Sequence, residues 1–389
     1  QTVPMLAKLG IKVAVIDDMG VWPELSEYRV ALNPFGAVVQ AYLRDKRDVI
    51  YAMETITHAL IEEAKDDAKN KYWRAWPRTL IEFAHGVLLK RDPHSAIPGA
   101  VSAILSDPEM VRSFAEIEAE EGEGLLRSQA RAIRDMASHE HWPQHIDEAI
   151  RALRPFSEGT RLHEAGRGAT LTHADLIRDG YVIFLVGPQA HMSRLGCYYA
   201  SHIQSFCSAL YQRAGKLAVI ADEFTNTPLK SLVESLTTLR AFGGELHLIA
   251  QSRSEIIRKF GEQETRTLED NCITKLWYGF SSFEEAERVS KAMGEEHAVA
   301  EGLSGDHFGL KSQSSLSLIK QRVLSAAELM ALPPGTALMH VKGIGFTLID
   351  LYSQNQIAPF CDLLAENPLE GGRLPPDPQI RLVLPGERA

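Results

Sequence analysis

The sequence predicts an α/β fold in which a mostly parallel sheet is interrupted by an all-α domain. Strand and helix patterns alternate from about residue 160, an order typical of a parallel sheet covered by helices. A strand pattern also occurs near the start, whereas residues 45–159 are helical in pattern and poor in β-branched runs. We therefore expect a sheet domain formed by residues 1–44 and 160–366, an all-α insertion at 45–159, and a Pro-rich tail at 367–389.

The composition is that of an ordinary globular protein. The 389 residues are 45% hydrophobic and 24% charged, which allows a large core. No apolar run reaches the roughly 18 residues that a membrane-spanning helix needs. The net charge of −10 argues against a simple basic nucleic-acid-binding domain, although a ring needs only a few basic inward loops. Because the sequence starts at Gln1 without an initiator Met or signal-peptide pattern, we interpret it as a fragment.

The cysteines show no C-x-x-C spacing and lie mostly among apolar residues. We therefore expect reduced core thiols rather than disulfides or zinc ligands. The four cysteines are Cys197, Cys207, Cys272 and Cys361.

The first elements follow from local patterns. Residues 2–9 are expected to form a helix, and residues 11–16 a strand closed by two acids. Residues 29–32 favour a second strand, followed by a turn at 33–36. Helices then fill 45–159, with breaks near Pro93, Pro98, Pro108 and Pro143. The first of these helices is indicated by apolar residues at helical spacing: Ile50, Met53, Ile56, Leu60 and Ile61.

The second half continues the sheet. Residues 181–186 are apolar throughout, as expected of an interior strand. Strands at 217–221, 246–250 and 273–278 alternate with helices, one of which opens with a capping pattern at Ser282. Strands at 336–341 and 346–352 complete the sheet. Residues 304–317, rich in Gly and Ser, are expected to form a loop.

Two carboxylates, Asp222 and Glu223, follow the apolar strand at 217–221. In open α/β sheets ligands bind beyond the carboxyl ends of the strands. In nucleoside-triphosphate hydrolases with this Walker B pattern, the first acid holds Mg²⁺ and the second orients or deprotonates the attacking water. The same pattern also arises where acids at a strand end simply meet water.

Two polar residues downstream strengthen the hydrolase interpretation. Arg240 lies in the last turn of the next helix, before Gly243, where it is either an arginine finger for a neighbouring subunit or a partner of the helix dipole. Gln251 follows the strand at 246–250 and would lie beside Asp222 if the two strands are neighbours. It is either a sensor of the γ-phosphate or an ordinary turn residue.

The sequence contains no G-x-x-x-x-G-K-[ST] phosphate loop. Residues 214–217 include Gly-Lys but lack the upstream Gly and the hydroxyl. A phosphate loop precedes a helix–strand pair like that at 2–16, so we expect the loop before Gln1 and little activity in the fragment itself.

The order and spacing of these motifs resemble the coupling ATPases of conjugation and type IV secretion, which are RecA-like P-loop NTPases. The resemblance covers nearly the whole chain and is specific as a series rather than piece by piece. Its segments are residues 15–20, 32–35, 71–76, 153–156, 180–188, 221–224, 240–243, 248–254, 277–279 and 284–294. The chain departs from the family in lacking the phosphate loop and the membrane anchor. It also has Asp18 and Met19 where Pro and a basic or polar residue are usual.

The resemblance implies ATP and Mg²⁺ as cofactors, with Asp222 as the metal ligand, Glu223 as the activator of water and Gln251 as the sensor. Arg240 would reach the nucleotide of a neighbouring subunit in a homo-hexamer. The resemblance also assigns cofactor contacts to Thr2 and Asp17. Contacts to DNA fall on Arg253, Arg258 and Lys259, unless these cations are simply solvated.

The function implied is ATP-driven pumping of single-stranded DNA into a type IV secretion channel during conjugation. The partners would be relaxase, accessory proteins and channel subunits, and the location the cytoplasmic face of the bacterial inner membrane. Three alternatives stay open: a motor for protein effectors only, a non-hydrolysing docking module, and a chromosome-segregation or septal DNA translocase.

Three other groups of residues suggest a functional site, but each also has a structural explanation. The histidines at 139, 141 and 145 suggest a metal site, but we expect a surface cluster. Three arginines at 127, 131 and 134 share a helix face and follow the acidic run 116–123, which favours a salt-bridged surface over a DNA contact. Trp73 and Trp76 could stack on bases, but their helical spacing favours core positions.

Overall fold

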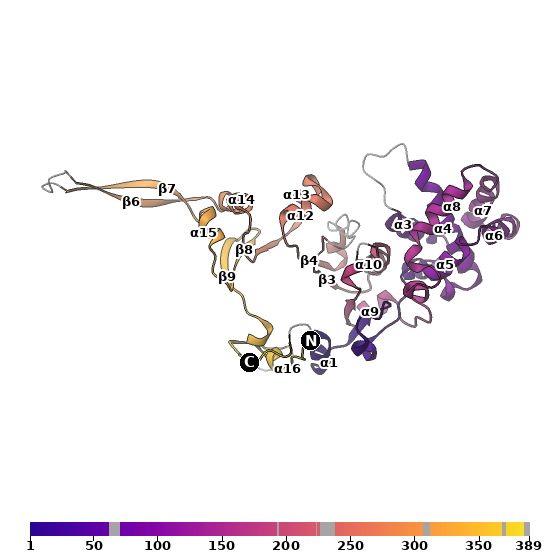
Figure 1. The fold of residues 1–389 in the computed structure, drawn as a ribbon, viewed down its shortest axis with the longest axis horizontal. Coiled ribbons are helices and arrows are strands. Elements are labelled where there is room, and N and C mark those ends of the chain that lie inside the picture. Colours follow the sequence, from indigo (N-terminus) through magenta and orange to yellow (C-terminus); the bar gives the residue numbers. More distant parts are fainter. Residues whose placement is uncertain are drawn as a thin grey trace. The chain divides into compact units, whose positions relative to one another are not determined.

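A computed structural model describes residues 1–61, 71–192, 194–222, 224–225, 238–305, 312–367 and 371–384. The chain divides into two compact units. One comprises residues 2–261, and the other comprises residues 262–389 together with Gln1. Figure 1 shows the order of the elements along the chain.

The first unit opens with helix α1 (Thr2–Lys8) and the buried strand β1 (Val13–Ile16). Strand β1 pairs in parallel with β2 (Val182–Leu185), so that Val13 lies opposite Val182. The strand expected at 29–32 is wrong. Only a single bridge joins Arg29 to Val15, and the chain then turns at Asn33, whose side chain accepts the Phe35 N–H at 2.9 Å.

Helices make up the regular structure of the described residues between 36 and 152 (Figure 1). The prolines expected to break helices mostly begin them instead, because the first turn needs no N–H donor. Pro98 and Pro108 are first residues of helices, and Asp107 caps the second of these. The helices are α2 (Gly36–Arg44), α3 (Val49–Leu60), α4 (Lys71–Arg91), α5 (Pro98–Leu105), α6 (Pro108–Glu121), α7 (Gly124–Met136) and α8 (Trp142–Ala152).

Helices α6 and α7 form a pair tied by charges, as expected from the sequence. Arg134 bridges to Glu120 at 3.3 Å, and Arg131 donates from Nε to the Ala119 carbonyl at 3.3 Å. Arg127 donates to the Glu120 carbonyl at 3.3 Å. The interpretation of this arginine face as a salt-bridged surface is therefore confirmed for Arg134, whereas Arg127 and Arg131 bind backbone carbonyls of α6.

The remainder of the first unit supplies a second parallel strand pair. Helices α9 (His173–Arg178) and α10 (Gly196–Tyr211) lead to β3 (Leu217–Ala221), which pairs in parallel with β4 (Gly244–Leu248). Helix α12 (Arg253–Phe260) comes next. The helix expected between β3 and β4 lies largely outside the described residues.

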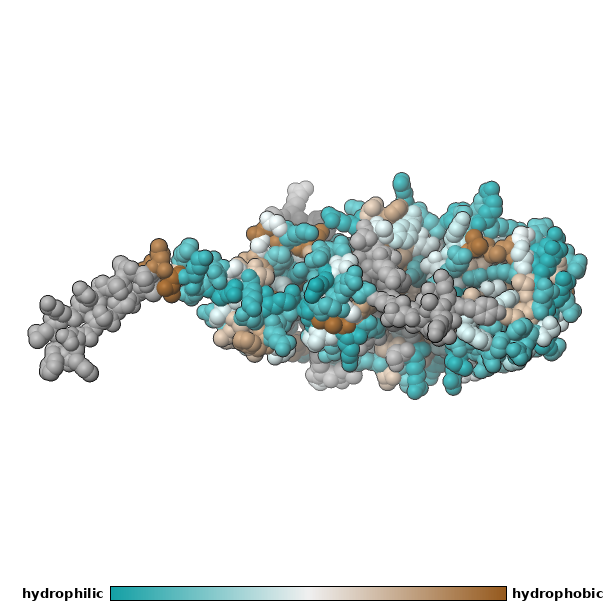
Figure 2. All heavy atoms as spheres, turned by 90° about the horizontal axis from the view of Figure 1, so that it is seen from above, coloured by the Kyte–Doolittle hydropathy of each residue, from teal (hydrophilic) through white to brown (hydrophobic). Residues whose placement is uncertain are grey.

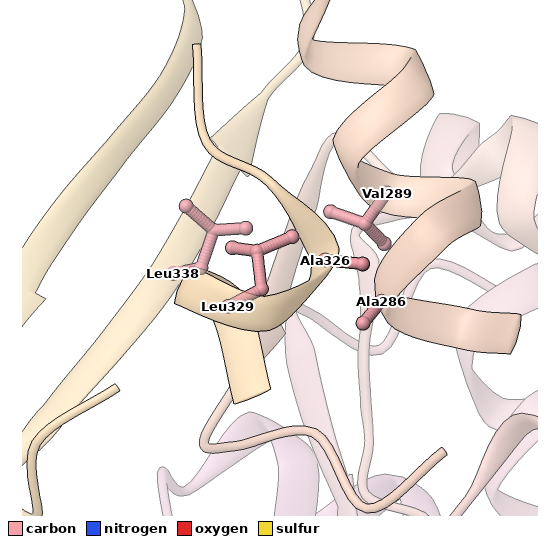
Figure 3. Close-up of a cluster of buried hydrophobic side chains, with 5 residues drawn as sticks. All are labelled: Ala286, Val289, Ala326, Leu329 and Leu338. Atoms are coloured by element: carbon pink, nitrogen blue, oxygen red, sulfur yellow. The ribbon is translucent and has the colours of Figure 1, made fainter. Parts of the chain in front are cut away.

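The strands expected at 273–278, 336–341 and 346–352 do not complete the parallel sheet: they form a separate three-stranded antiparallel sheet of the second unit, in the order β5-β8-β9. Buried side chains of α14 and α15 pack against it: Ala286 and Val289 face Ala326, Leu329 and Leu338 in Figure 3. The elements of this sheet and its cover are α13 (Glu262–Asn271), β5 (Thr274–Trp277), α14 (Phe283–Met293), α15 (Ala326–Met330), β8 (Thr336–Val341) and β9 (Gly345–Asp350). The short elements β10 (Ile357–Ala358), α16 (Phe360–Leu363) and β11 (Ile380–Arg381) end the unit.

Two long strands replace both ends of the loop expected at 304–317, whose residues 306–311 lie outside the described residues. Strands β6 (Glu295–Gly305) and β7 (Ser312–Arg322) pair antiparallel along their whole length (Figure 1). The expectation is wrong because the Ser-Leu-Ser-Leu alternation at 315–318 is a period-two strand pattern, which the high Gly and Ser content obscured.

The surface and the thiols agree with the sequence analysis. The face in Figure 2 is mostly hydrophilic with small separate hydrophobic patches. No helix in the described ranges combines the length and apolarity required to cross a bilayer. The four cysteines are free, and burial raises the pKa of Cys207 to about 12, which keeps that thiol protonated.

Three histidines in the first unit are buried as neutral rings. Burial lowers the pKa of His85 to about 4 and that of His173 to about 3, and it also lowers the pKa of His202. His173 and His202 share a ring-to-ring hydrogen bond of 3.0 Å. His85 contacts Phe35, with ring centroids 5.1 Å apart. Because the unfolded chain binds protons more readily below pH 6.5, acid should unfold this unit.

The substitution His85→Leu tests this explanation. The native pKa lies below the unfolded one, so stability is complete above pH 6.5 and falls as the pH drops towards 4, by up to about 1.4 kcal/mol per pH unit for each histidine. Replacing His85 should reduce the slope of the free energy of unfolding against pH by the contribution of one bound proton. Urea unfolding between pH 7.5 and 4.5 measures it, and exposed His94→Gln is the control. An unchanged slope in His85→Leu contradicts the explanation.

Candidate functional site

The candidate site lies at the carboxyl ends of β3 and β4, which are neighbouring strands as expected. Ala221 pairs with Leu248 at the end of the ladder. The backbone bonds continue beyond both strands: Ile249 donates to the Ala221 carbonyl at 3.0 Å, and Phe224 donates to the Ile249 carbonyl at 3.1 Å. Asp222 and Gln251 therefore come after adjacent parallel strands at the same edge of the sheet.

Asp222 and Gln251 are both exposed at this edge. Glu223, the second acid of the motif, lies outside the described residues. Within the described ranges, no group of three or more His, Cys, Asp or Glu is placed to hold a metal ion. The donors at this edge suit Mg²⁺, which binds oxygen and is commonly held by one or two carboxylates together with water and substrate phosphates.

Helix α12 begins directly after the Gln251-Ser252 pair. Ser252 caps it, accepting the Glu255 N–H through Oγ at 3.3 Å. Because Ile249 is bonded to the segment after β3, and Ser252 is bonded to α12, Gln251 is held between two fixed points. This local order is what a side chain needs if it is to report on a group bound beside Asp222.

Arg240 begins a short 3-10 turn, Arg240–Phe242, and its side chain is exposed. Gly243 ends the turn in the left-handed conformation, with φ of 84°. A Cβ at Gly243 would lie 2.9 Å from the Gly215 carbonyl oxygen, so this position needs glycine. The glycine end expected from the sequence is present, and Arg240 lies in the connection that leads into β4.

The three cations expected to contact DNA are not gathered in one place. Arg258 and Lys259 both lie in the last turn of α12, whereas Arg253 is half-buried at its first residue. The two ends of an eight-residue helix are about 10 Å apart. The structure therefore pairs Arg258 with Lys259 and separates Arg253 from them.

Asp17, expected to contact the cofactor, has internal partners. Its Oδ1 accepts the Val21 N–H at 2.9 Å, and its Oδ2 accepts the Trp22 N–H at 2.9 Å. Arg29 adds an ion pair to Oδ2 at 3.2 Å, and Asp17 itself is only 1% exposed. These bonds make Asp17 the residue that shapes the loop after β1. Thr2, the other expected cofactor contact, is exposed at the start of α1.

Sequence reasoning missed the second bond that holds this loop. Tyr198, from α10, donates its hydroxyl to Asp18 Oδ2 at 2.9 Å, and burial raises the pKa of Asp18. The two residues are far apart in the sequence, and neither lies in a motif that points to the other. The loop after β1 is thus held by the bond from Tyr198 of α10 to Asp18 and by the bonds that Asp17 accepts within the loop.

The aromatic residues of α4 differ from their expected core positions. Trp73 is 37% exposed, and Trp76 is half-buried. Trp73 meets His141 edge-on at 4.8 Å and His145 at 5.3 Å. His145 is buried, so the histidines at 139–145 form a surface cluster only in part. The expectation failed because Trp73 and Trp76 pack beside His145 of α8, where each ring stays partly exposed.

Comparisons with known proteins agree with the fold. Residues 216–334 match the family model described as the TraM recognition site of TraD and TraG. The fold is similar to that of the bacterial conjugative coupling protein TrwBdeltaN70, at a TM-score of 0.59 and 16% identity over 89% of this chain and 79% of that one. No curated protein gave a significant match.

Two further TrwB structures are similar. The complex with a non-hydrolysable GTP analogue has a TM-score of 0.58 and 16% identity over 88% of this chain and 74% of that one. The complex with ADP and Mg²⁺ has a TM-score of 0.53 and 16% identity over 78% and 68%. The predicted α/β fold is thereby confirmed as one shared with TrwB, and the family-model match agrees with the resemblance noted from the sequence.

The structural part played by Asp17 is tested by Asp17→Asn. The amide keeps one acceptor but loses the charge paired with Arg29 and one N–H partner, so unfolding should become easier by about 1–3 kcal/mol. Chemical denaturation measures this, with exposed Glu24→Gln as the control. A variant as stable as the control would show that the loop does not depend on this carboxylate.

Proposed function

We propose that this chain is part of an ATP-driven coupling protein that moves single-stranded DNA into a type IV secretion channel during conjugation. The observation that carries the proposal is the placement of Asp222 and Gln251 beyond adjacent parallel strands. That edge is where α/β nucleotide hydrolases bind their ligand. The fold shared with TrwB, a conjugative coupling protein, supports the proposal.

The chemistry proposed is hydrolysis of the γ-phosphate of ATP. Mg²⁺ bound with ATP supplies positive charge against the phosphate oxygens. Asp222 holds the metal, directly or through water, and Glu223 accepts a proton from the attacking water or orients it. Gln251 hydrogen-bonds the γ-phosphate or that water. Thr2 and Asp17 stay as proposed cofactor contacts, Asp17 through the loop that it shapes rather than by its bonded oxygens.

Arg240 is proposed to act across a subunit boundary in a homo-hexamer. An exposed arginine that precedes a rigid glycine turn can reach out from its own subunit without disturbing β4. An arginine finger supplied in this way raises phosphoryl-transfer rates by roughly three to five orders of magnitude. Hydrolysis should therefore be slow in isolated subunits.

We propose that the domains divide this work. Residues 1–44 and 160–366 would form the nucleotide-binding domain, residues 45–159 would dock relaxase and accessory proteins, and residues 367–389 would be an extended tail. The assembled protein would face the cytoplasm at the bacterial inner membrane and contact channel subunits. The net charge of −10 favours a second candidate, a motor for protein effectors only, because DNA is repelled by negative charge.

The carboxylate pair is tested by Asp222→Asn and Glu223→Gln in the protein as encoded. Each should lower the ATP hydrolysis rate at least about a hundredfold, the range expected for loss of a positioned proton acceptor or charge. Glu223→Gln should still bind ATP, because only the water is affected. Glu245→Gln, at the opposite end of β4, is the matched control. Wild-type rates in both variants would leave the docking-module alternative in place.

The cargo is tested by adding single-stranded DNA to the same ATPase assay. DNA should stimulate hydrolysis, and Arg258→Ala with Lys259→Ala should weaken both the stimulation and its dependence on salt, since each lost phosphate contact reduces the salt slope by about one. The matched control is Arg178→Ala, a cation at the end of α9. Rates unaffected by DNA would favour the protein-effector candidate.

A further inference from the structure

The segment after β3 is packed against α12 by a pair of buried aromatic rings. Phe224 and Phe260 stack with centroids 5.8 Å apart and an interplanar angle of 14°. They are 1% and 8% exposed. Phe224 is two residues from Asp222, and Phe260 is the last residue of α12. The stack therefore links the carboxylate end of β3 to the end of the helix that carries Arg258 and Lys259.

A polar contact joins the same two segments at the other end of the helix. Thr225, 7% exposed, donates its hydroxyl to Glu255 Oε2 at 3.4 Å. The Glu255 backbone is in turn bonded to the cap Ser252. The first and last turns of α12 thus each make one side-chain contact with residues 224–225.

The backbone completes the link. The Phe224 N–H bonds the Ile249 carbonyl, so Phe224 and Thr225 are held between the extension of β4 and the side of α12. Each of these contacts is made by a neighbour of Asp222 and leaves its carboxylate out of the bonding. These contacts determine the position of the backbone next to Asp222 and therefore the position of its carboxylate.

We propose that Phe260 and Glu255 are positioning residues for the Asp222 segment, acting through Phe224 and Thr225, so that α12 couples the metal end of β3 to the cations in its last turn. This inference rests on the proposed function. The geometry of a catalytic carboxylate must hold to a fraction of an ångström, and small misplacements are costly. Binding of an anionic polymer to Arg258 or Lys259 would act on the helix whose last residue, Phe260, packs against Phe224.

The test compares two Phe→Leu variants of equal burial in the same unit. Phe260→Leu removes the stack on Phe224, whereas Phe206→Leu removes a 9% exposed ring that packs on His173 instead. In the protein as encoded, Phe260→Leu should raise the Mg²⁺ concentration for half-maximal ATP hydrolysis about fivefold, the equivalent of one aromatic pair. Phe206→Leu should leave that concentration unchanged even if it lowers the melting temperature equally.

Thr225→Val guards against a folding defect, because it preserves shape and removes only the hydroxyl. It should shift the Mg²⁺ dependence in the same direction by a smaller factor, about twofold. Glu255→Gln, which can still accept from Thr225, should stay near the wild-type value. On this chain alone, amide exchange at Phe224 should be faster in Phe260→Leu than in Phe206→Leu.

The outcomes separate the inference from the function on which it rests. If the wild-type protein does not hydrolyse ATP, the proposed function and the inference both fall. If it hydrolyses ATP, and Phe260→Leu and Thr225→Val show the Mg²⁺ dependence of Phe206→Leu, only the positioning role falls. Equal exchange at the Phe224 amide in the two Phe→Leu variants overturns the packing link itself.

Discussion

The arrangement of the candidate site depends on the parallel backbone ladder between β3 and β4. Its register runs from Leu217 opposite Gly244 to Ala221 opposite Leu248, and two further bonds extend it past both strands. A slip of one residue would turn every side chain to the other face of the pair and separate the two polar strand ends. The ladder involves only backbone atoms, so it tolerates side-chain change along β3 and β4 while keeping Asp222 and Gln251 at one edge.

The start of β4 explains why that register is specific. The carbonyl of Gly243 accepts the Leu217 N–H at 3.0 Å, and the left-handed turn at Gly243 brings its backbone within van der Waals reach of Gly215. A side chain at Gly243 would collide with the Gly215 carbonyl, so the close approach at the start of the ladder requires glycine at this residue. The same turn fixes Arg240 three residues earlier. One glycine thus relates the exposed arginine, the start of β4 and, through the ladder, the polar residues at its far end.

Local patterns in the sequence predicted most of the elements but not their long-range partners. The strands expected at 11–16, 217–221 and 336–341 are all present, the first as Val13–Ile16, because apolar runs bounded by turn residues are a short-range signal. The strand at 29–32 failed since Asn33 turns the chain, and the strands at 295–305 and 312–322 were hidden by their glycines and serines. The placement of Asp222 and Gln251 at one edge came from the rule for parallel strands. The contacts Asp18–Tyr198 and Phe224–Phe260 could not be predicted, because each joins segments whose approach is set by the folded core.

Two acids that end parallel strands in the same unit show what decides the role of such a residue. Asp17 comes after β1 and is buried, with two N–H groups and one guanidinium filling its oxygens. Asp222 comes after β3 and keeps part of its surface exposed. The motif "apolar strand, then acid" is common to both, so the motif alone does not separate a loop-shaping carboxylate from one that can take a metal.

The difference lies in the path of the chain beyond each strand. After β1 the chain turns back and presents its own N–H groups to Asp17, whereas after β3 the chain is drawn away by Phe224 and Thr225 towards α12. A carboxylate that already accepts three hydrogen bonds has little left to offer a cation, because about three of its four lone-pair sites are used. The packing that leaves Asp222 at the edge of the sheet is therefore as much a part of the candidate site as the carboxylate itself.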